Sequence, residues 1–480
     1  MTTTKESSLN SEQTSQFVDR FWEEQILPTL SSYIEIPNQS ILFDPEWKKN
    51  GHMDRAVALV REWVEKQNIS GLRLEVIEDT GRTPVILIEV DGANDDTILL
   101  YGHLDKQPAM VGWDKELGPW KPVRRGDKLF GRGGADDGYA VFSIISMVKA
   151  LQEQKIPHAR LVALIETCEE SGSLDLPHYV EKFSGRIGTP SLVICLDSGC
   201  GNYDRLWLTT TLRGAIVGNL TVDVLTEGVH SGDASGIVPS SFRILRVLLD
   251  RLEDAKSGEL IPEWMSIDVP PHRMEQIRQT AEIMGDNVWS QFPFVEGMTP
   301  LSKDPVELII NRTWKPTVCY TGQAGMPDLV QGGNVLRPQT SLKLSIRIPP
   351  GVDADTIETK LTELLTSDPP YGAKVTLDLE KGASGWEAPK TVPWLARSLD
   401  AASNAFFGHS VANLGEGGSI PFMGMLGEKF PEAQFVVTGV LGPYSNAHGP
   451  NEFLHIPMAK KVSMCMARVV ADAFEARSAR

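Results

Sequence analysis

Histidine and acidic residues recur where apolar runs of the sequence stop, and these side chains can bind metals and move protons. The run TILLYGHLD ends in His103 and Asp105, and the run ARLVALIETCEE ends in Glu169 and Glu170. An ionised carboxylate held away from water is costly unless it is paired or bound to a metal. The adjacent glutamates therefore lie either in a solvated loop, where most acids at strand ends are found, or in a metal site.

Three further segments carry side chains of the same kind. GRGGADDG holds Asp136, SLVICLDSG ends in Asp197, and PYSNAHGPNE holds His448. Each alone has an ordinary explanation as a turn, a helix cap or a surface histidine. Carboxylates that met in one crevice would repel one another unless cations neutralised them, and histidine with carboxylate ligands suits zinc, manganese or cobalt. The set predicts a site for two divalent metal ions, with Zn²⁺ expected and Mn²⁺ or Co²⁺ as alternatives.

The elements expected to carry these residues are buried strands that alternate with helices. Near-continuous apolar runs at 85–92, 97–105, 159–166 and 191–199 are typical of strands, and a buried helix is expected at 139–151. This order indicates an α/β fold with a mostly parallel sheet covered on both faces. In such sheets ligands bind at the carboxyl ends of the strands, which is where the acids and histidines fall.

From about residue 212 the pattern changes to that of a smaller inserted domain. Alternating runs at 215–226, 341–349 and 374–382 are typical of half-buried strands, and helices are expected at 241–252 and, with an Asp cap, at 353–365. Strand, helix, strands, helix and strand suggest an α+β sandwich of the ferredoxin-like type. The segment 256–334, rich in Pro, Trp and Gly, is expected to be an elaborated insertion.

After Pro393 the α/β pattern resumes, with a helix to about Phe407, a strand at 434–440 and a terminal helix from Met458. We therefore expect one domain over 1–212 and 390–480, interrupted by the inserted domain at 213–389.

Composition excludes several classes of function. The chain has 480 residues, which favours two domains, and its formal net charge of −17 argues against nucleic acid and anionic membrane surfaces. No apolar run reaches the roughly 18 residues that a membrane span needs. The five cysteines form no CxxC pair, and the N-terminal sequence lacks the apolar core of a secretory signal. A cytoplasmic protein is the expectation.

Two other kinds of enzyme site fit the sequence poorly. GRGGADDG departs from the GxGxxG spacing of dinucleotide loops, and its aspartates would face the pyrophosphate. The GxSxG turn of many serine hydrolases is absent from the sequence.

The segments GHLDKQP, GRGGADDG, EESGS, LDSG and NAHGPNE, in this order, resemble the M20 family of metallopeptidases, in particular its cytosolic non-specific dipeptidase and carnosinase branch. The resemblance implies a homodimeric hydrolase with two metal ions that cleaves dipeptides or short peptides beside a free C-terminal carboxylate. Two departures concern the substrate. The dipeptidases usually read DDKG where this chain reads DDGY, and the loop from Trp289 to Trp314 has no counterpart that we can align.

The resemblance also implies roles for single residues in the catalytic, metal-binding domain. Asp105 would orient the imidazole of His103. Glu169 would act as general base and acid, taking a proton from water and returning it to the leaving amine. The implied metal ligands are His103, Asp136 as the bridge, Glu170, Asp197 and His448.

The inserted domain would then serve as lid and dimerisation domain. His230, in GVHSG, matches a histidine that the partner subunit supplies to stabilise the oxyanion. Arg347 matches an arginine that grips the substrate carboxylate, a task for which a guanidinium fork is suited. Asn334 and Ser419 match positions that contact the substrate or its oxyanion, although the dipeptidases often have Thr in place of Asn334.

Two alternatives remain open at this point. An N-acyl-amino-acid amidohydrolase of the same superfamily would have the same metals and a different acyl pocket. A non-catalytic binding homologue would keep the fold without the reaction, but it would have no need to retain all seven of the residues expected at the metal centre.

Overall fold

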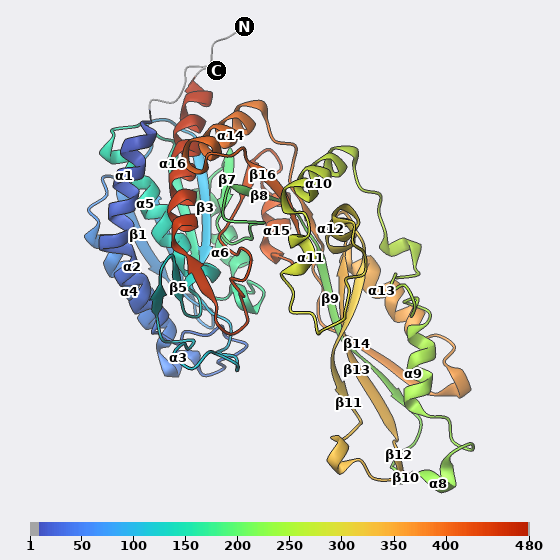
Figure 1. Cartoon of the computed structure of the whole chain (residues 1–480). Coiled ribbons are helices and arrows are strands. Elements are labelled where there is room, and N and C mark those ends of the chain that lie inside the picture. The colour runs from blue at the N-terminus through green and yellow to red at the C-terminus, as the bar shows by residue number, and fades with distance from the viewer. Residues whose placement is uncertain (1–8, 479–480) are drawn as a thin grey trace. The chain divides into compact units, whose positions relative to one another are not determined.

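The structure, a computed structural model, describes residues 9–478 and divides into two compact units (Figure 1). Of the described residues, 9–210, 388–414 and 425–478 form the first unit, and 211–387 with 415–424 form the second. The polar N-terminal stretch at 1–8 and the residues 479–480 lie outside the described part.

A six-stranded sheet forms the centre of the first unit, in the order β1-β2-β6-β3-β7-β17. The pairs β6–β3, β3–β7 and β7–β17 are parallel, whereas β1 and β2 join antiparallel at one edge. This confirms the predicted mostly parallel sheet. The strands are β1 (Leu72–Ile77), β2 (Val85–Val90), β3 (Thr97–His103), β6 (Arg160–Glu166), β7 (Leu192–Cys195) and β17 (Gln434–Val437).

Long helices cover this sheet because the strands are apolar on both faces. Every residue of β2, β3 and β7 is buried, as a strand covered on both faces requires. α5 contacts β3 and packs against α16, which in turn packs against α14 and α1 (Figure 1). The helices are α1 (Ser11–Phe21), α2 (Leu27–Ile34), α3 (Trp47–Asn50), α4 (His52–Lys66), α5 (Tyr139–Glu153), α6 (Leu176–Lys182), α7 (Ser184–Ile187), α14 (Pro393–Phe407) and α16 (Ile456–Ser478), with a π-helical turn, η1 (Trp22–Ile26), between α1 and α2.

The parallel strands end together at one edge of the sheet. In the pairing of β3 with β6, His103 lies opposite Glu166, and Tyr101 lies opposite Cys195 of β7. Short turns follow or flank these ends, namely η3 (Glu169–Ser171) after β6 and η2 (Gly134–Gly138) before α5. The small sheet of β4 (Val123–Arg125), β5 (Lys128–Phe130) and β18 (Phe453–His455) adjoins the segments that carry Asp136 and His448.

A four-stranded antiparallel sheet, in the order β11-β13-β9-β14, forms the second unit with the helices α9 and α13. Along the chain these elements run strand, helix, strand, strand, helix, strand, which confirms the expected ferredoxin-like sandwich. The side chain of Asp353 accepts a hydrogen bond from Thr356 N at 2.9 Å and so caps α13, as the sequence predicts. The elements are β9 (Gly214–Asp223), α9 (Ser241–Leu249), β11 (Thr317–Ala324), β13 (Gln339–Ile348), α13 (Ala354–Thr366) and β14 (Lys374–Leu379).

Buried aliphatic side chains from both helices and the inner face of the sheet form the core of this unit. The segment expected to be an insertion adds three helices and also supplies β11, so it is part of the sheet rather than wholly an addition to it. The remaining elements of the second unit are β10 (Val229–His230), α8 (Ser231–Ala234), α10 (Pro271–Met284), α11 (Asn287–Ser290), α12 (Pro305–Thr313), β12 (Val335–Leu336) and β15 (Trp386–Glu387). Of the described elements, three contain residues of both units, namely β8 (Trp207–Leu212), β16 (Ala412–Glu416) and α15 (Pro421–Lys429).

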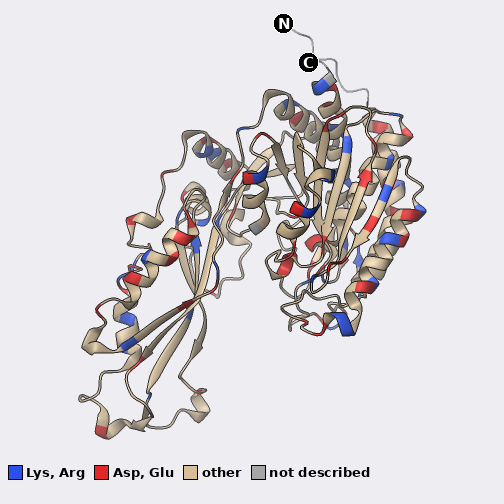
Figure 2. Ribbon diagram, turned by 180° about the vertical axis from the view of Figure 1, so that it is seen from behind, with Lys and Arg blue, Asp and Glu red and all other residues tan. Residues whose placement is uncertain are grey.

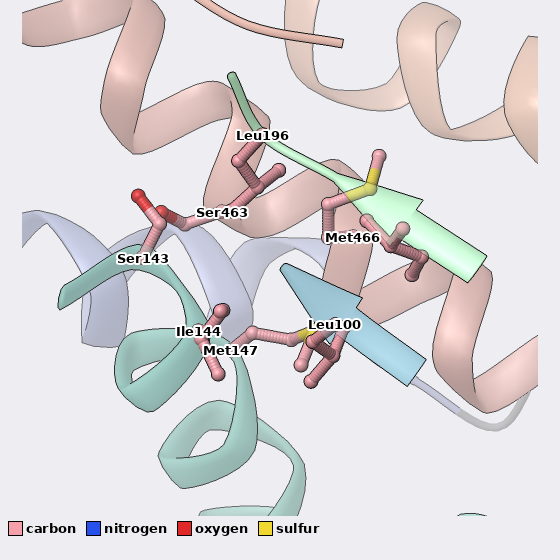
Figure 3. Close-up of a pocket in the computed structure, with 8 residues that line it drawn as sticks. Leu100, Ser143, Ile144, Met147, Leu196, Ser463 and Met466 are labelled. Atoms are coloured by element: carbon pink, nitrogen blue, oxygen red, sulfur yellow. The ribbon is translucent and has the colours of Figure 1, made fainter. Parts of the chain in front are cut away.

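Basic and acidic side chains are interspersed over the described residues, and no continuous basic face stands out in the view of Figure 2. Within residues 9–478, no helix is both long and apolar enough to cross a membrane. A small cavity lies in the core of the first unit, where side chains of α5 and α16 meet those of β3 and β7 (Figure 3). Its lining is mainly aliphatic and includes no acidic side chain, so this cavity is separate from the predicted metal site.

Candidate active site

His103, the last residue of β3, is the side chain around which the acidic residues gather. Its Nε2 atom lies 3.5 Å from Asp136 Oδ1, 3.8 Å from Asp197 Oδ1 and 4.0 Å from Glu169 Oε2. The imidazole is buried, and its Nδ1 atom lies 3.1 Å from the carbonyl oxygen of Asp105. The nitrogen that faces the carboxylates is therefore free to act as a ligand while the other is held by the backbone.

His448 approaches the same cluster from the loop that precedes β18. Its Nε2 atom lies 3.0 Å from Asp136 Oδ2 and 3.4 Å from Glu170 Oε2. The side chain of Gln107 donates a hydrogen bond of 2.6 Å to the same oxygen of Glu170. Four segments that are distant in the sequence thus meet at one edge of the sheet.

Two sets of side chains have the spacing of a metal site. The potential ligand atoms of His103, Asp136 and Glu170 lie within 4.8 Å of one another, and so do those of His103, Asp137 and Asp197. Asp137 is unassigned by the sequence analysis. Its Oδ2 atom accepts a hydrogen bond from the backbone N–H of His103 at 3.2 Å, while its Oδ1 atom is buried without a partner among the described residues.

Asp105 has a wider role than the predicted orientation of His103. Its Oδ1 atom lies 3.4 Å from His103 Nδ1, but its two oxygens also accept the backbone N–H groups of Glu169, at 3.1 Å, and Glu170, at 3.0 Å. Asp105 is fully buried. One carboxylate therefore holds the turn that carries both glutamates, in addition to facing the histidine.

Burial and neighbouring charges shift the pKa values of the acidic residues in this cluster. Burial, and then the charge of Asp197, raises the pKa of Glu169 well above its usual range, and burial with the charge of Asp136 does the same for Glu170. Burial raises the pKa of Asp197 to about 6. Asp136 is the exception, because its interactions with the nearby imidazoles of His103 and His448 together outweigh its burial and hold its pKa well below the usual value.

Some buried atoms of the cluster have no hydrogen-bond partner within residues 9–478, and they show whether divalent ions would fit there. His103 Nε2 and Glu170 Oε1 are buried and have no hydrogen-bond partner among the described residues; His103 is a member of both close sets described above, and Glu170 is a member of one. Buried polar atoms are normally satisfied, so unsatisfied ligand atoms that converge on one point fit bound cations. The residues present therefore fit a metal centre.

The second unit brings the remaining predicted residues together in two pairs. His230 ends β10 and Asn334 directly precedes β12, the strand that pairs with β10. The carbonyl oxygen of Asn334 accepts the backbone N–H of Ser231 at 3.0 Å, and the side chains of His230 and Asn334 are exposed. Arg347 of β13 forms the other pair with Ser419, whose hydroxyl accepts a hydrogen bond of 2.9 Å from Arg347 Nη1.

Arg213 lies beside the second pair, and the sequence analysis missed it. Its carbonyl oxygen accepts the Ser419 hydroxyl at 2.5 Å, and its guanidinium donates to Gly417 O and to Thr317 Oγ1. Burial, and then the charges of Arg347 and Arg312, lower the pKa of Arg213 to about 10. Among the described residues, no carboxylate pairs with Arg213 or Arg347, so the cluster carries uncompensated positive charge.

The sequence held a signal for some of the missed residues. Gln107 stands in GHLDKQP and Asp137 in GRGGADDG, so both lie within motifs quoted above. Arg213 follows a strand in the run TTTLRG, where a single arginine carries no periodic signal.

The model of peptidase family M20/M25/M40 matches residues 99–472, which is most of the chain. This chain belongs to that family. It is therefore a metal-dependent peptidase, as the clustered ligands at the edge of its sheet also indicate.

Several curated proteins that are similar to this M20 peptidase are named as dipeptidases. A cysteinylglycine-S-conjugate dipeptidase of Corynebacterium striatum is 25% identical over 378 residues, which cover 76% of this chain and 79% of that protein. The beta-Ala-His dipeptidase of Homo sapiens is 26% identical over 446 residues, covering 86% and 83% of the two chains. Among solved structures, the dipeptidase Dug1p of Saccharomyces cerevisiae superimposes with a TM-score of 0.76 at 21% identity over 97% of this chain and 98% of that one.

Proposed function

We propose that this M20 peptidase is a dipeptidase that uses two metal ions to cleave the peptide bond of dipeptides or short peptides with a free C-terminal carboxylate. The observation that carries the proposal is the convergence of His103, Asp136, Glu170, Asp197 and His448 at the carboxyl edge of the sheet. The names of two similar proteins, the cysteinylglycine-S-conjugate dipeptidase and the beta-Ala-His dipeptidase, support the choice of substrate class.

The buried cluster would hold the ions through the residues that the family motifs match. Asp136 lies between His103 and His448, with one oxygen toward each, and is the proposed bridge. Zn²⁺ is the proposed metal, and Mn²⁺ or Co²⁺ would accept the same ligands. Bound ions of this kind supply an acidified water and a polarised carbonyl group.

Glu169 is the proposed general base and acid. Its carboxylate lies beside His103 without direct contact to His448, and its backbone is held by Asp105. Burial and neighbouring carboxylates raise its pKa, which gives the group affinity for the proton that it would take from water and return to the leaving amine.

Arg347 and Ser419 are the proposed holders of the substrate carboxylate. A guanidinium without a carboxylate partner, next to a second buried arginine, favours an anion, and a planar fork matches a carboxylate with two bonds. This arrangement supports a requirement for a free C-terminus. Asn334 and His230, at the paired ends of β10 and β12, are the proposed contacts to the substrate or its oxyanion.

A homodimer formed through the second unit is part of the proposal. Near His230 and Asn334 in the sequence, Ile237, Leu329 and Val330 are 81%, 98% and 99% exposed, and such apolar side chains are candidates for burial against a second copy. We further propose that residues 213–389 act as lid and dimerisation domain, while 1–212 and 390–480 form the catalytic domain. The five cysteines are free, which agrees with the expected cytoplasmic, reducing compartment.

The test compares hydrolysis of Ala-Leu with that of acetyl-Leu by chelator-stripped protein to which Zn²⁺ or Mn²⁺ is returned. We expect metal-dependent cleavage with preference for Ala-Leu, which carries a free amine. Preference for acetyl-Leu would replace the proposed function by that of an N-acyl-amino-acid amidohydrolase. If neither metal restored cleavage of either compound, the proposed substrate class would be wrong.

A further inference from the structure

A buried ion pair connects the two motifs that bring Asp136 and His448 together. Arg132 stands four residues before Asp136 in GRGGADDG, and Glu452 stands four residues after His448 in NAHGPNE. Arg132 Nη1 lies 2.5 Å from Glu452 Oε2, and the two side chains are 1% and 0% exposed. The family roles given above leave both residues unassigned.

The contacts of this pair reach three of the segments around the metal cluster. Arg132 Nε donates to Pro108 O at 3.1 Å, and Pro108 follows Gln107 in the loop after β3. Arg132 Nη2 donates to Gly449 O at 2.8 Å, directly after His448. In return, the other carboxylate oxygen of Glu452 accepts the backbone N–H of Gly133 at 2.9 Å.

His448 lies in an exposed loop, so the contacts of that loop with buried segments determine where its imidazole sits. Its side chain is 56% exposed, and its backbone has a φ of 66°, a left-handed conformation that only a restrained loop keeps in a residue other than glycine. Besides the local bond from Gly449 N to Asn446 O at 2.9 Å, the loop accepts the backbone N–H of Asp114 on Asn451 Oδ1 at 2.9 Å, and Glu452 O accepts that of Gly131 at 3.0 Å. The buried pair therefore joins an otherwise exposed loop to the turn that carries Asp136.

The energetics of a buried ion pair favour a positioning role over a stabilising one. Desolvation of two charges offsets most of their attraction, so such pairs are weak evidence for stability. A guanidinium that donates to three acceptors in fixed directions instead determines the geometry of the segments around it. We propose that Arg132 and Glu452 are positioning residues that hold His448 at the distance from Asp136 needed to bind the second metal ion. This inference rests on the proposed ligand roles of Asp136 and His448.

The experiment titrates chelator-stripped protein with Co²⁺ and follows each binding step by calorimetry and by visible absorption of the bound ion. The test variant combines Arg132→Met with Glu452→Met, so that no single buried charge is left unpaired and the chain can fold. We expect the weaker of the two Co²⁺ steps to lose 10- to 100-fold in affinity, about the range seen when groups supporting metal ligands are removed, while the tighter step is kept. The single variant Arg132→Lys keeps the charge without the fork and should weaken the same step by less.

A matched control removes a buried carboxylate elsewhere in the same unit. Glu89 of β2 is buried and accepts from Arg186 Nη2 at 2.6 Å, near the end of the sheet opposite the metal cluster, so Glu89→Gln should leave both Co²⁺ steps unchanged. The proposal that Arg132 and Glu452 position His448 would be wrong if the double variant bound both ions with wild-type affinity. It would also be wrong if the affinities of the two binding steps fell equally. A wild-type chain that bound only one ion would overturn the proposed dinuclear centre together with this inference, and the wild-type titration alone reports that outcome.

Discussion

Asp105→Asn tests the finding that one buried carboxylate holds both the histidine and the two glutamates of the site. In the wild type its oxygens accept the N–H groups of Glu169 and Glu170 at 3.1 and 3.0 Å. Asparagine has nearly the same shape, but one of its two terminal atoms becomes an NH₂ group, which cannot accept a hydrogen bond. One of the two backbone N–H groups is then left facing a donor in a buried position.

The size of the effect follows from these contacts. A hydrogen bond to a charged group contributes about 1.5–3 kcal/mol, and a buried donor left without a partner costs about 1–3 kcal/mol. We therefore expect the free energy of unfolding to fall by about 3 kcal/mol. Relief of the repulsion between Asp105 and the two neighbouring glutamates, whose pKa values burial and nearby carboxylates raise, offsets part of this loss.

Function should suffer more than stability in this variant. A displaced turn moves one proposed metal ligand and the proposed base together, and a shift of about 1 Å at a reacting group lowers rates by about 100-fold. The assays are urea unfolding of the metal-free protein, Zn²⁺ affinity by competition with a chelator, and kcat for Ala-Leu.

The matched control for this variant is Asp175→Asn. Asp175 is also buried and accepts the backbone N–H of Thr83 at 2.9 Å, but its ion pair is with Arg82. The control should lose a similar free energy of unfolding while keeping Zn²⁺ affinity. If Asp105→Asn kept wild-type Zn²⁺ affinity and kcat, the idea that Asp105 positions the glutamates would be refuted.

Four further predictions concern the base, the anion site, the charge of the cluster and the core. Glu169→Gln should lower kcat by at least about 100-fold with unchanged metal content, measured by hydrolysis and atomic absorption, and near-normal turnover would contradict the proton role. Arg347→Lys should raise KM for Ala-Leu more than it lowers kcat, because an ammonium group cannot form two parallel hydrogen bonds to the substrate carboxylate. An unchanged KM would count against the proposal that Arg347 holds this carboxylate. Burial raises the pKa of Asp197 to about 6, so its contribution to stability is full below the unfolded value near 4 and is lost as pH rises through about 6. The melting temperature of stripped protein should thus fall further below that of Zn²⁺-loaded protein between about pH 4 and 6, and a difference between the two melting temperatures that stayed constant in calorimetry would refute this. Ser143→Ala removes a buried hydroxyl that has no partner among the described residues and lines the cavity of Figure 3, so unfolding in urea should show no loss and a gain of up to about 1 kcal/mol.

The sequence by itself was sufficient to predict five of the six strands of the main sheet, all except β1, and the residues at their ends. β2, β3 and β6 are continuous apolar runs, which are a local signal, and parallel strands bring their carboxyl ends to one edge. The positions of His103 and Glu169 follow from that rule. β11 could not be predicted in the same way, because most of its residues are exposed and show no alternation of apolar and polar side chains.

Only the tertiary structure decided which partners hold these residues. Arg132 and Glu452 are 320 positions apart in the chain, and Asp105 is 64 positions from Glu169, so no local spacing relates them. The same limit applies to Arg213, which meets Ser419 across 206 positions. Residue types and periodicity determine what a segment can form, whereas a hydrogen bond between distant segments depends on how the whole chain packs, and that information is not contained in any one stretch of sequence.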